Sequence, residues 1–408
     1  MQDIEAIKNH VCDEVEALRT KMIQINDWLY DHPELGSEEY QSSEYLTAIL
    51  ERKKFVVHRG TARIPTAFTA SFGEGSPKVA FLAEYDALPG VGHGCGHNMI
   101  AASAVGAGIA VSKALSHPGT VKVIGTPDEE ARGKYGVGKA LLVKAGVFRD
   151  VDVALMMHGG TKYSITRPAL AAQYMQITFK GRISHAAASP EKGINALDAA
   201  ILTYVGVNTL RQHVRRNANV VIHGVIVEGG KAANVIPGLA VLKYGVRSTD
   251  NKYVPELVEK IKRCARGAAM TTGAKVEFDA HMPMFEAVKH NTALEELVVR
   301  NLRSLGVRPE EPEATRGEMP EGSNDLGNVS QVVPAVSITT KICPAGTPGH
   351  SAKMREATKS AEGRRGMITA TKTMAMCALE LMLDRALLKS VKTVHSVGRY
   401  HKKGENTA

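Results

Sequence analysis

Between residues 78 and 157, short apolar runs alternate with segments whose apolar residues follow helical spacing. The apolar runs cover residues 79–83, 121–125 and 151–157, and short loops separate them from the intervening segments. This alternation predicts parallel βαβ units, because two parallel strands need a crossover helix between them. Ligands of such sheets bind beyond the carboxyl ends of the strands. Polar residues that directly follow these runs are therefore the first candidates for a functional site.

The pattern changes near residue 170 and returns near residue 283. The middle segment predicts a β-α-β-β-α order, which forms a small open sheet with helices on one face. Its predicted strands are 173–180, 219–227 and 239–247, and its predicted helices are 194–213 and 254–269. We therefore predict one α/β domain formed by residues 1–170 and 283–408, with a smaller domain inserted at 171–282.

The length and composition are those of a globular protein with more than one domain. A chain of 408 residues exceeds one comfortable core, and 44% hydrophobic with 23% charged residues is ordinary for a globular protein. The five cysteines are odd in number and scattered, which argues against a disulfide framework. The N-terminus carries no apolar stretch of signal-peptide length, and residues 100–111 are too short to span a bilayer. We expect a soluble, cytoplasmic protein without a membrane partner.

The formal charge of +9 raises the question of a nucleic-acid partner. Much of the excess lies near the C-terminus, where Tyr400 is the one aromatic residue and no nucleic-acid motif occurs. We predict a solvated basic tail there and no nucleic-acid binding. Its basic residues are Lys389, Lys392, Arg399, Lys402 and Lys403.

A first candidate site lies in the glycine-rich loop 89–97, which contains Cys95-Gly96-His97. A thiolate and an imidazole two residues apart can bind a borderline divalent metal. An isolated Cys-x-His is more often a buried structural pair. Here the surrounding glycines leave these two side chains nearly alone in the loop, which favours a metal site. His93 is interpreted as an ordinary loop residue.

A second candidate is the carboxylate pair Glu129-Glu130, which follows the apolar run 121–125. Two carboxylates that point into one site repel each other unless a cation offsets them. A dinuclear metal centre supplies that cation and lets one carboxylate bind metal while the other moves protons. His158, at the end of run 151–157, and His350, in a Pro/Gly loop, extend the possible ligand set. A lone histidine is more often structural, but both positions favour a site.

A possible phosphate-binding loop occurs at residues 133–139, which fit the spacing G-x-x-x-x-G-K. The next residue is Ala140, where that motif needs Ser or Thr to bind magnesium. The segment also directly follows the acidic pair, which would repel a phosphate. We therefore do not expect nucleotide binding.

Taken in order along the chain, these motifs resemble the M20 metallopeptidase/amidohydrolase family. The branch with M20 domain-containing protein 2 and the aminobenzoyl-glutamate hydrolase subunits is the most similar. The resemblance runs over nearly the whole chain and rests on five motifs: His32-Pro33-Glu34-Leu35, Ala83-Glu84-Tyr85-Asp86-Ala87-Leu88-Pro89, Gly94-Cys95-Gly96-His97-Asn98, Gly125-Thr126-Pro127-Asp128-Glu129-Glu130 and Pro348-Gly349-His350-Ser351.

The resemblance implies an α/β fold with a parallel-sheet, phosphorylase/hydrolase-like zinc-exopeptidase catalytic domain. The inserted domain would be an α+β, ferredoxin-like lid and dimerisation domain, which implies a homodimer. The family also implies two divalent metal ions in each subunit. Zinc or manganese is expected, and cobalt or nickel is possible, because a mixed S/N/O ligand set accepts several metals. Matched to this sequence, the metal ligands would be Cys95, His97, Glu130, His158 and His350, with Cys95 as the bridge.

The remaining roles are carried over in the same way. Glu129 would be the general base, and Asp86 would orient a metal ligand from behind it. His185, in the segment 181–187, would reach the neighbouring subunit's site and donate to the scissile carbonyl. Asn234 and Arg247 would hold a substrate carboxylate, a task that suits the arginine fork.

The sequence departs from the family pattern in two places. Gly238 stands where relatives often carry an acidic residue, and Arg132 and Lys134 lie in a loop that is usually richer in glycine. Both departures concern substrate choice.

The expected activity is exo-acting hydrolysis of an amide bond in dipeptide-like or N-acyl amino acid substrates that carry a free carboxylate. Two alternatives remain open at this point. One is an enzyme of the same fold run toward amide synthesis, and the other is a catalytically silent binding or regulatory subunit.

Overall fold

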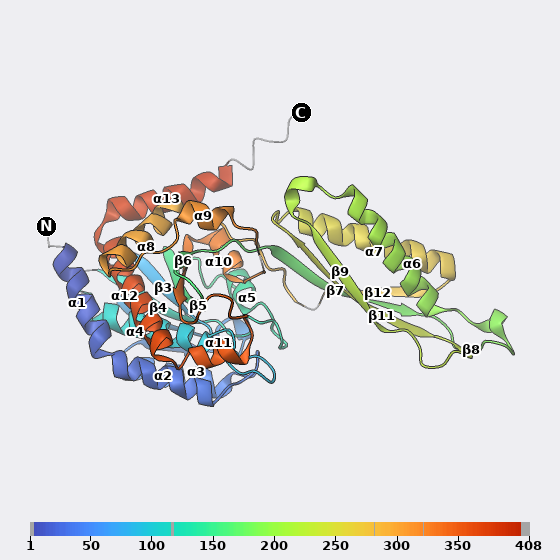
Figure 1. The fold of residues 1–408 in the computed structure, drawn as a ribbon, viewed down its shortest axis with the longest axis horizontal. Coiled ribbons are helices and arrows are strands. Elements are labelled where there is room, and N and C mark those ends of the chain that lie inside the picture. The colour runs from blue at the N-terminus through green and yellow to red at the C-terminus, as the bar shows by residue number, and fades with distance from the viewer. Residues whose placement is uncertain (1–3, 116–117, 281, 321, 401–408) are drawn as a thin grey trace. The chain divides into compact units, whose positions relative to one another are not determined.

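In the computed structural model the chain forms two compact units (Figure 1). The structure describes residues 4–115, 118–280, 282–320 and 322–400. The first unit takes its residues from 1–168, 288–320 and 325–408, and the second from 169–287 and 321–324.

The first unit contains a seven-stranded sheet and the helices that pack around it. Its strands are β1 (Val56–Arg59), β2 (Phe68–Glu74), β3 (Lys78–Ala83), β4 (Gly119–Gly125), β5 (Val153–Gly160), β6 (Ser164–Ile165) and β13 (Ala335–Lys341). Its helices are α1 (Ile4–Ala17), α2 (Arg19–Asp31), α3 (Tyr40–Arg52), α4 (His97–Ala114), α5 (Gly138–Lys144), α8 (Thr292–Ser304), α9 (Pro312–Gly317), α10 (Leu326–Val332), α11 (Ala352–Ala357), α12 (Ala361–Leu383) and α13 (Arg385–Tyr400).

The sheet is mixed, with the predicted parallel strands at its centre. The strand order is β1-β2-β4-β3-β5-β13-β6. The central strands β4, β3, β5 and β13 are parallel, whereas β2 and β6 pair antiparallel with the outer two of them and β1 pairs antiparallel with β2. The apolar runs identify buried strands but carry no information on their direction, so the antiparallel flanks were not predicted.

Helix α4 lies at the centre of this core, and 16 of its residues are buried. It contacts β3, β4 and β5 as well as the helices α1, α2 and α12. Its small side chains allow this close approach. A side chain on Gly106 would meet Met22, and one on Gly108 would meet Val123.

Two details of the N- and C-terminal segments differ from the sequence predictions. The helical spacing of the apolar residues over 12–30 predicts one helix, whereas the structure has two helices, α1 and α2, which meet at Leu18. Lys389 and Lys392 belong to helix α13, whose Leu388 and Val391 are buried, so this segment is not a solvated tail. Helix α13 packs against α8 and α12, and Lys392 forms an ion pair with Asp152. Lys402 and Lys403 lie outside the described residues.

The second unit is an antiparallel sheet with two helices packed on it. The strand order is β12-β7-β11-β9, and α6 and α7 contact each other and the central strands (Figure 1). A separate two-stranded ribbon pairs β8 with β10. The elements of this unit are β7 (Ala171–Lys180), β8 (Ser184–His185), α6 (Ala196–Leu210), β9 (Val221–Glu228), β10 (Val235–Ile236), β11 (Leu239–Ser248), α7 (Tyr253–Thr272) and β12 (Lys275–Asp279).

Within the part of the chain that the structure describes, no helix is both long enough and apolar enough to span a bilayer.

Candidate metal and catalytic site

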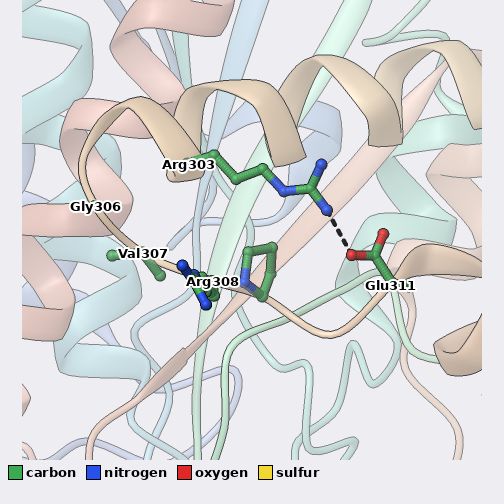
Figure 2. A pocket seen from close by; sticks show the side chains of 6 residues that line it. Arg303, Gly306, Val307, Arg308 and Glu311 are labelled. Atoms are coloured by element: carbon green, nitrogen blue, oxygen red, sulfur yellow. Dashed lines mark hydrogen bonds and ion pairs between the residues drawn. The ribbon is translucent and has the colours of Figure 1, made fainter.

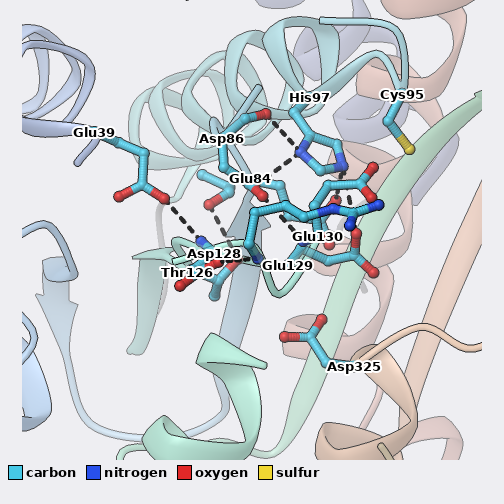
Figure 3. A network of polar contacts seen from close by, with 12 residues as sticks. Glu39, Glu84, Asp86, Cys95, His97, Thr126, Asp128, Glu129, Glu130 and Asp325 are labelled. Atoms are coloured by element: carbon cyan, nitrogen blue, oxygen red, sulfur yellow. Dashed lines mark hydrogen bonds and ion pairs between the residues drawn. The ribbon is translucent and has the colours of Figure 1, made fainter. Parts of the chain in front are cut away.

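Most of the predicted site residues of the first unit meet where its central parallel strands end (Figure 3). The loop after β3 leads to Cys95 and His97, and the loop after β4 carries Glu129 and Glu130. His158 lies within β5 itself, because this strand extends to Gly160 rather than ending at residue 157. The loop after β13 carries His350, whose backbone N–H donates to Gly94 O.

His97 is held in one orientation from behind. Its Nδ1 lies 2.8 Å from Asp86 Oδ1 and 2.9 Å from the Asp86 carbonyl oxygen, so Nδ1 carries a proton and Nε2 is the ring atom left to bind a second proton or a metal ion. Asp86 Oδ2 also accepts from the backbone N–H of Glu130 at 3.0 Å. One buried carboxylate therefore fixes the His97 ring and the start of the acidic loop.

The Nε2 atom of His97 has no hydrogen-bond partner, although it is fully buried. Carboxylate oxygens of Glu84 and Glu129 lie 3.4 and 3.7 Å from it. Burial opposes a charge on this ring, but Asp86, Cys95 and Glu84 raise the pKa of His97 well above its usual value. The surroundings of this ring therefore favour a cation at Nε2.

Cys95 and His158 form a second pair of potential ligands. Cys95 Sγ lies 3.4 Å from His158 Nε2, and His158 Nδ1 donates to Gly159 O at 2.7 Å. The histidine thus turns its lone pair toward the sulfur. Burial raises the pKa of the Cys95 thiol to about 12. A metal ion would reverse this shift, because a coordinated thiol is deprotonated.

Glu130 and His350 form a third contact, with His350 Nε2 3.1 Å from Glu130 Oε1. Glu129 is buried, with an exposed fraction of 7%, and its Oε2 lies 3.7 Å from His97 Nε2. Burial, and then repulsion from Glu84, Asp325 and Glu130, raises the pKa of Glu129 well above its usual value. Glu130 is therefore paired with a histidine, as expected of a metal ligand, whereas the surroundings of Glu129 favour a bound proton, as expected of a base.

The loop that carries the two glutamates is held in an unusual backbone conformation. Asp128, Ala131 and Val137 all have positive φ angles, between 52° and 63°. The Asp128 carboxylate stabilises this path, because it accepts from Ser37 Oγ and from the backbone N–H groups of Arg132 and Gly133. Strained backbone of this kind is concentrated at functional sites, where the surrounding structure fixes it.

Three buried site residues were not predicted from the sequence. Lys139 Nζ lies 2.5 Å from Glu84 Oε1 and also forms an ion pair with Asp325, and all three side chains are fully buried. Lys139 belongs to the apparent phosphate-binding motif, but its ammonium is bound to these two carboxylates. Glu84 stands two residues before Asp86 at the end of β3, which is the one sequence signal that pointed to it. Nothing in the sequence around Asp325 indicated a site.

The donor set fits divalent metal ions. The potential ligand atoms of Cys95, Glu130 and His350 all lie within 4.8 Å of one another, and so do those of His97, Glu129 and Glu130. Glu130 belongs to both groups. Mixed sulfur, nitrogen and oxygen donors of this kind suit zinc and several other transition metals.

The other predicted site residues belong to the second unit. His185 pairs with Val235 across the β8–β10 ribbon, next to Asn234. Its Nδ1 accepts from the backbone N–H groups of Ala187 and Ala188, which leaves Nε2 free. Arg247 lies on β11 and donates to Tyr174 Oη at 2.7 Å.

A separate hollow of about 530 Å³ lies on the first unit, at the C-terminal end of α8 (Figure 2). It is lined by Arg303, Gly306, Val307, Arg308, Pro309 and Glu311. None of these is a predicted site residue, and Arg303 already pairs with Glu311 at 2.5 Å.

Two curated relatives are similar to this chain over nearly its full length. The Xaa-Arg dipeptidase of Mus musculus is 34% identical, and the alignment covers 96% of this chain and 92% of that protein. A p-aminobenzoyl-glutamate hydrolase subunit of Escherichia coli (strain K12) is 32% identical, with 96% of this chain and 95% of that protein covered.

A solved structure and a family profile agree with these relatives. A dinuclear metal-binding peptidase of the M20 family from Bacillus subtilis is similar in fold, with a TM-score of 0.64 and 22% identity. The alignment covers 90% of this chain and 99% of that one. The sequence profile of Peptidase family M20/M25/M40 matches residues 80–380. This chain therefore belongs to peptidase family M20/M25/M40, and it is a metal-dependent hydrolase of amide or peptide bonds.

Proposed function

We propose that this protein is an exo-acting amide hydrolase with two divalent metal ions, which cleaves dipeptide-like or N-acyl amino acid substrates that carry a free carboxylate. The observation that carries the proposal is the convergence of metal donors around the buried carboxylate of Glu129. The ions would be zinc or manganese. Their ligands would be Cys95, His97, Glu130, His158 and His350.

When bound, such ions lower the pKa of a coordinated water and polarise a carbonyl oxygen. The carboxylate of Glu129 would take the proton of the attacking water and return it to the leaving amine nitrogen. Its raised pKa suits this exchange, because a base that must also act as an acid works best with a pKa near the working pH. Asp86 would keep Nδ1 of His97 protonated and its Nε2 available.

The second unit would supply the contacts to the substrate. The Nε2 atom of His185 is free, because two backbone N–H groups occupy Nδ1, and it would donate to the developing oxyanion. Asn234 and Arg247 would hold the substrate carboxylate. The Nε atom of Arg247 is buried without a hydrogen-bond partner, so this guanidinium has a donor to offer.

The names of the two relatives support this substrate class. One describes a dipeptide that ends in arginine, and the other describes p-aminobenzoyl-glutamate. In both substrates the amide bond joins an acyl group to an amino acid with a free α-carboxylate.

We also propose a homodimer formed through the second unit. Strand β9 is an edge strand of its sheet, and Val221, Val225 and Val227 expose between 43% and 53% of their surface. Helix α6 exposes Ile201 and Val205, and it touches β9 through Tyr204, whose hydroxyl donates to Gly224 O. An exposed apolar edge strand is a surface that natural proteins usually cover. A second copy would cover it, because two identical edges can pair about a twofold axis.

The direct test is a hydrolysis panel of dipeptides and N-acyl amino acids with the wild type and Glu129→Gln. The wild type should carry about two divalent ions per chain and lose its activity on chelation. Glu129→Gln should keep the metal but lose about a thousandfold in kcat, because the proton acceptor is absent. Methyl esters of the same substrates serve as a control for carboxylate recognition. Full activity of Glu129→Gln would refute the assignment of the base.

A further inference from the structure

The buried contact of Lys139 with Glu84 and Asp325 has no role in the function proposed above. Lys139 Nζ binds Glu84 Oε1 at 2.5 Å and also binds Asp325. The backbone N–H of Lys139 donates to the other Asp325 oxygen at 2.9 Å. Asp325 therefore holds Lys139 at two points, and the ammonium has little freedom to move. All three side chains have no exposed surface.

Glu84 connects this contact to the metal and catalytic site. One of its oxygens binds Lys139, and the other, Oε2, lies 3.4 Å from the ligand nitrogen of His97 without a hydrogen-bond partner. A carboxylate with one free oxygen beside a metal-ligand atom would rotate toward a bound cation unless something held it. The ion pair with Lys139 is the contact that holds it.

Lys139 also anchors the loop that carries the two glutamates. The loop begins after β4 and ends at α5, whose second residue is Lys139. Asp325, the residue before α10, is the partner that ties this end of the loop to the rest of the unit, where α5 and α10 pack together. Figure 3 shows Glu84, Glu129 and Asp325 in the same network.

The charges of the buried side chains also indicate that Lys139 is needed to restrain Glu84. Glu84, Asp86, Glu129, Glu130 and Asp325 supply five carboxylates, and Lys139 supplies one ammonium. The difference is four negative charges, and a coordinated Cys95 thiolate makes it five, of which two divalent ions would offset four. Without Lys139, Glu84 would be an additional free carboxylate next to the ions.

We propose that Lys139 is a positioning residue for the hydrolysis: it keeps Glu84 away from the metal ions and holds the loop of Glu129 in place. This inference rests on the proposed function. Lys139 contacts neither the substrate nor a metal-binding residue, yet it should have a specific effect on turnover. A lysine with a merely structural role would contribute to stability alone.

The test compares Lys139→Met with the wild type in kcat per bound metal pair, in KM and in the dissociation constant for Co²⁺ followed by its absorption bands. Lys139→Met should lower kcat per bound metal by about tenfold or more with little change in KM. It should bind Co²⁺ about threefold more tightly or better, because the loss of one positive charge and the release of Glu84 both favour a cation. Lys139→Arg keeps the positive charge but replaces the compact ammonium with a larger guanidinium. Its kcat per bound metal and its Co²⁺ affinity should lie between those of the wild type and Lys139→Met.

Lys8→Met is the matched control, because Lys8 is also buried and ion-paired, with Glu5 and Glu380. It should leave kcat per bound metal and Co²⁺ affinity unchanged. The proposal is overturned if Lys139→Met keeps kcat per bound metal within twofold of the wild type, or if it binds Co²⁺ more weakly. If Lys139→Met does not fold, Lys139→Met/Asp325→Asn is measured instead, because it removes one of the two buried carboxylates left without a partner and keeps Glu84. This double variant should remain about tenfold slow, because Glu84 is still released, and full activity in it would refute the proposal. A wild type without metal-dependent turnover would refute the proposed function instead.

Discussion

Glu39 is a buried carboxyl whose protonation should be visible in the stability of the protein. Its Oε1 accepts from the backbone N–H of Asp128 at 2.8 Å, while its Oε2 has no hydrogen-bond partner. Burial, and then repulsion from Asp86, raises the pKa of Glu39 from 4.5 to about 8. Between these values the folded protein keeps a proton that the unfolded chain releases, so the free energy of unfolding falls as the pH rises.

We expect the metal-free protein to lose stability between pH 5 and pH 8, and Glu39→Gln to lose less. One such group contributes at most about 1.4 kcal/mol per pH unit. Urea unfolding in the presence of a chelator measures the free energy of unfolding at each pH. Glu38→Gln, which changes the exposed neighbouring residue, is the control. Equal losses in wild type and Glu39→Gln would show that Glu39 is not the titrating group.

At the same scale, the sequence predicted the chemically distinctive residues and the buried Asp86, but it missed the buried contact of Lys139 with Glu84 and Asp325. Cys95-Gly96-His97 could be recognised because it stands in the glycine-rich loop 89–97, and Glu129-Glu130 because the pair follows the apolar run 121–125. The partners Lys139 and Asp325 are 186 positions apart. A pairing over that distance leaves no local pattern, so it becomes visible once the chain is folded.

Helix α5 shows how a single element sets the position of the acidic loop. It begins at Gly138, directly after Val137 with its positive φ of 63°. A Cβ on Gly138 would lie 1.9 Å from the carbonyl oxygen of Pro127, which is backbone and cannot move aside cheaply. Only glycine therefore lets α5 start this close to the loop that leads to Glu129.

Gly138→Ala should destabilise the first unit by about 1–3 kcal/mol and reduce metal content. Gly267→Ala is the control, and it should raise the stability rather than lower it. Gly267 lies inside α7, where a Cβ would meet nothing within 4 Å, so alanine should add about 0.5–1 kcal/mol. Urea unfolding and metal analysis of both variants distinguish the cases. A Gly138→Ala variant with wild-type stability and metal content would refute the argument from close approach.

At the scale of elements, buried strands were easier to predict from the sequence than exposed edge strands. Strands β3, β4 and β5 were predicted because they are buried on both faces and read as continuous apolar runs. Strand β1 was missed because it lies at the edge of the sheet and three of its four residues are exposed. Strand β12 of the second unit was missed for the same reason, since it alternates exposed and half-buried residues at an edge.

At the scale of the whole molecule, the proposed dimer depends on the exposed apolar surface of α6 and β9. Val225 on β9 exposes 53% of its surface, and Val56 on β1, an edge strand of the first unit, exposes 62%. The two positions are a matched pair, because each is an exposed valine on an edge strand. Val225→Lys should convert the dimer into monomers in size-exclusion chromatography with light scattering. Val56→Lys should leave the dimer intact. A monomeric wild type would refute the dimer.

If His185 acts on the site of the neighbouring subunit, two inactive variants should restore each other. A mixed dimer of His185→Ala and Glu129→Gln has one site with both residues intact and one site with neither. Random exchange of equal amounts makes about half of the dimers mixed, so the mixture should recover about a quarter of wild-type activity. Steady-state hydrolysis after subunit exchange measures this recovery. The same mixture with Val225→Lys in both chains should recover nothing, because the monomers cannot share a site. If the first mixture stays inactive although exchange is complete, His185 serves the site of its own chain, and the second unit does not join the two active sites.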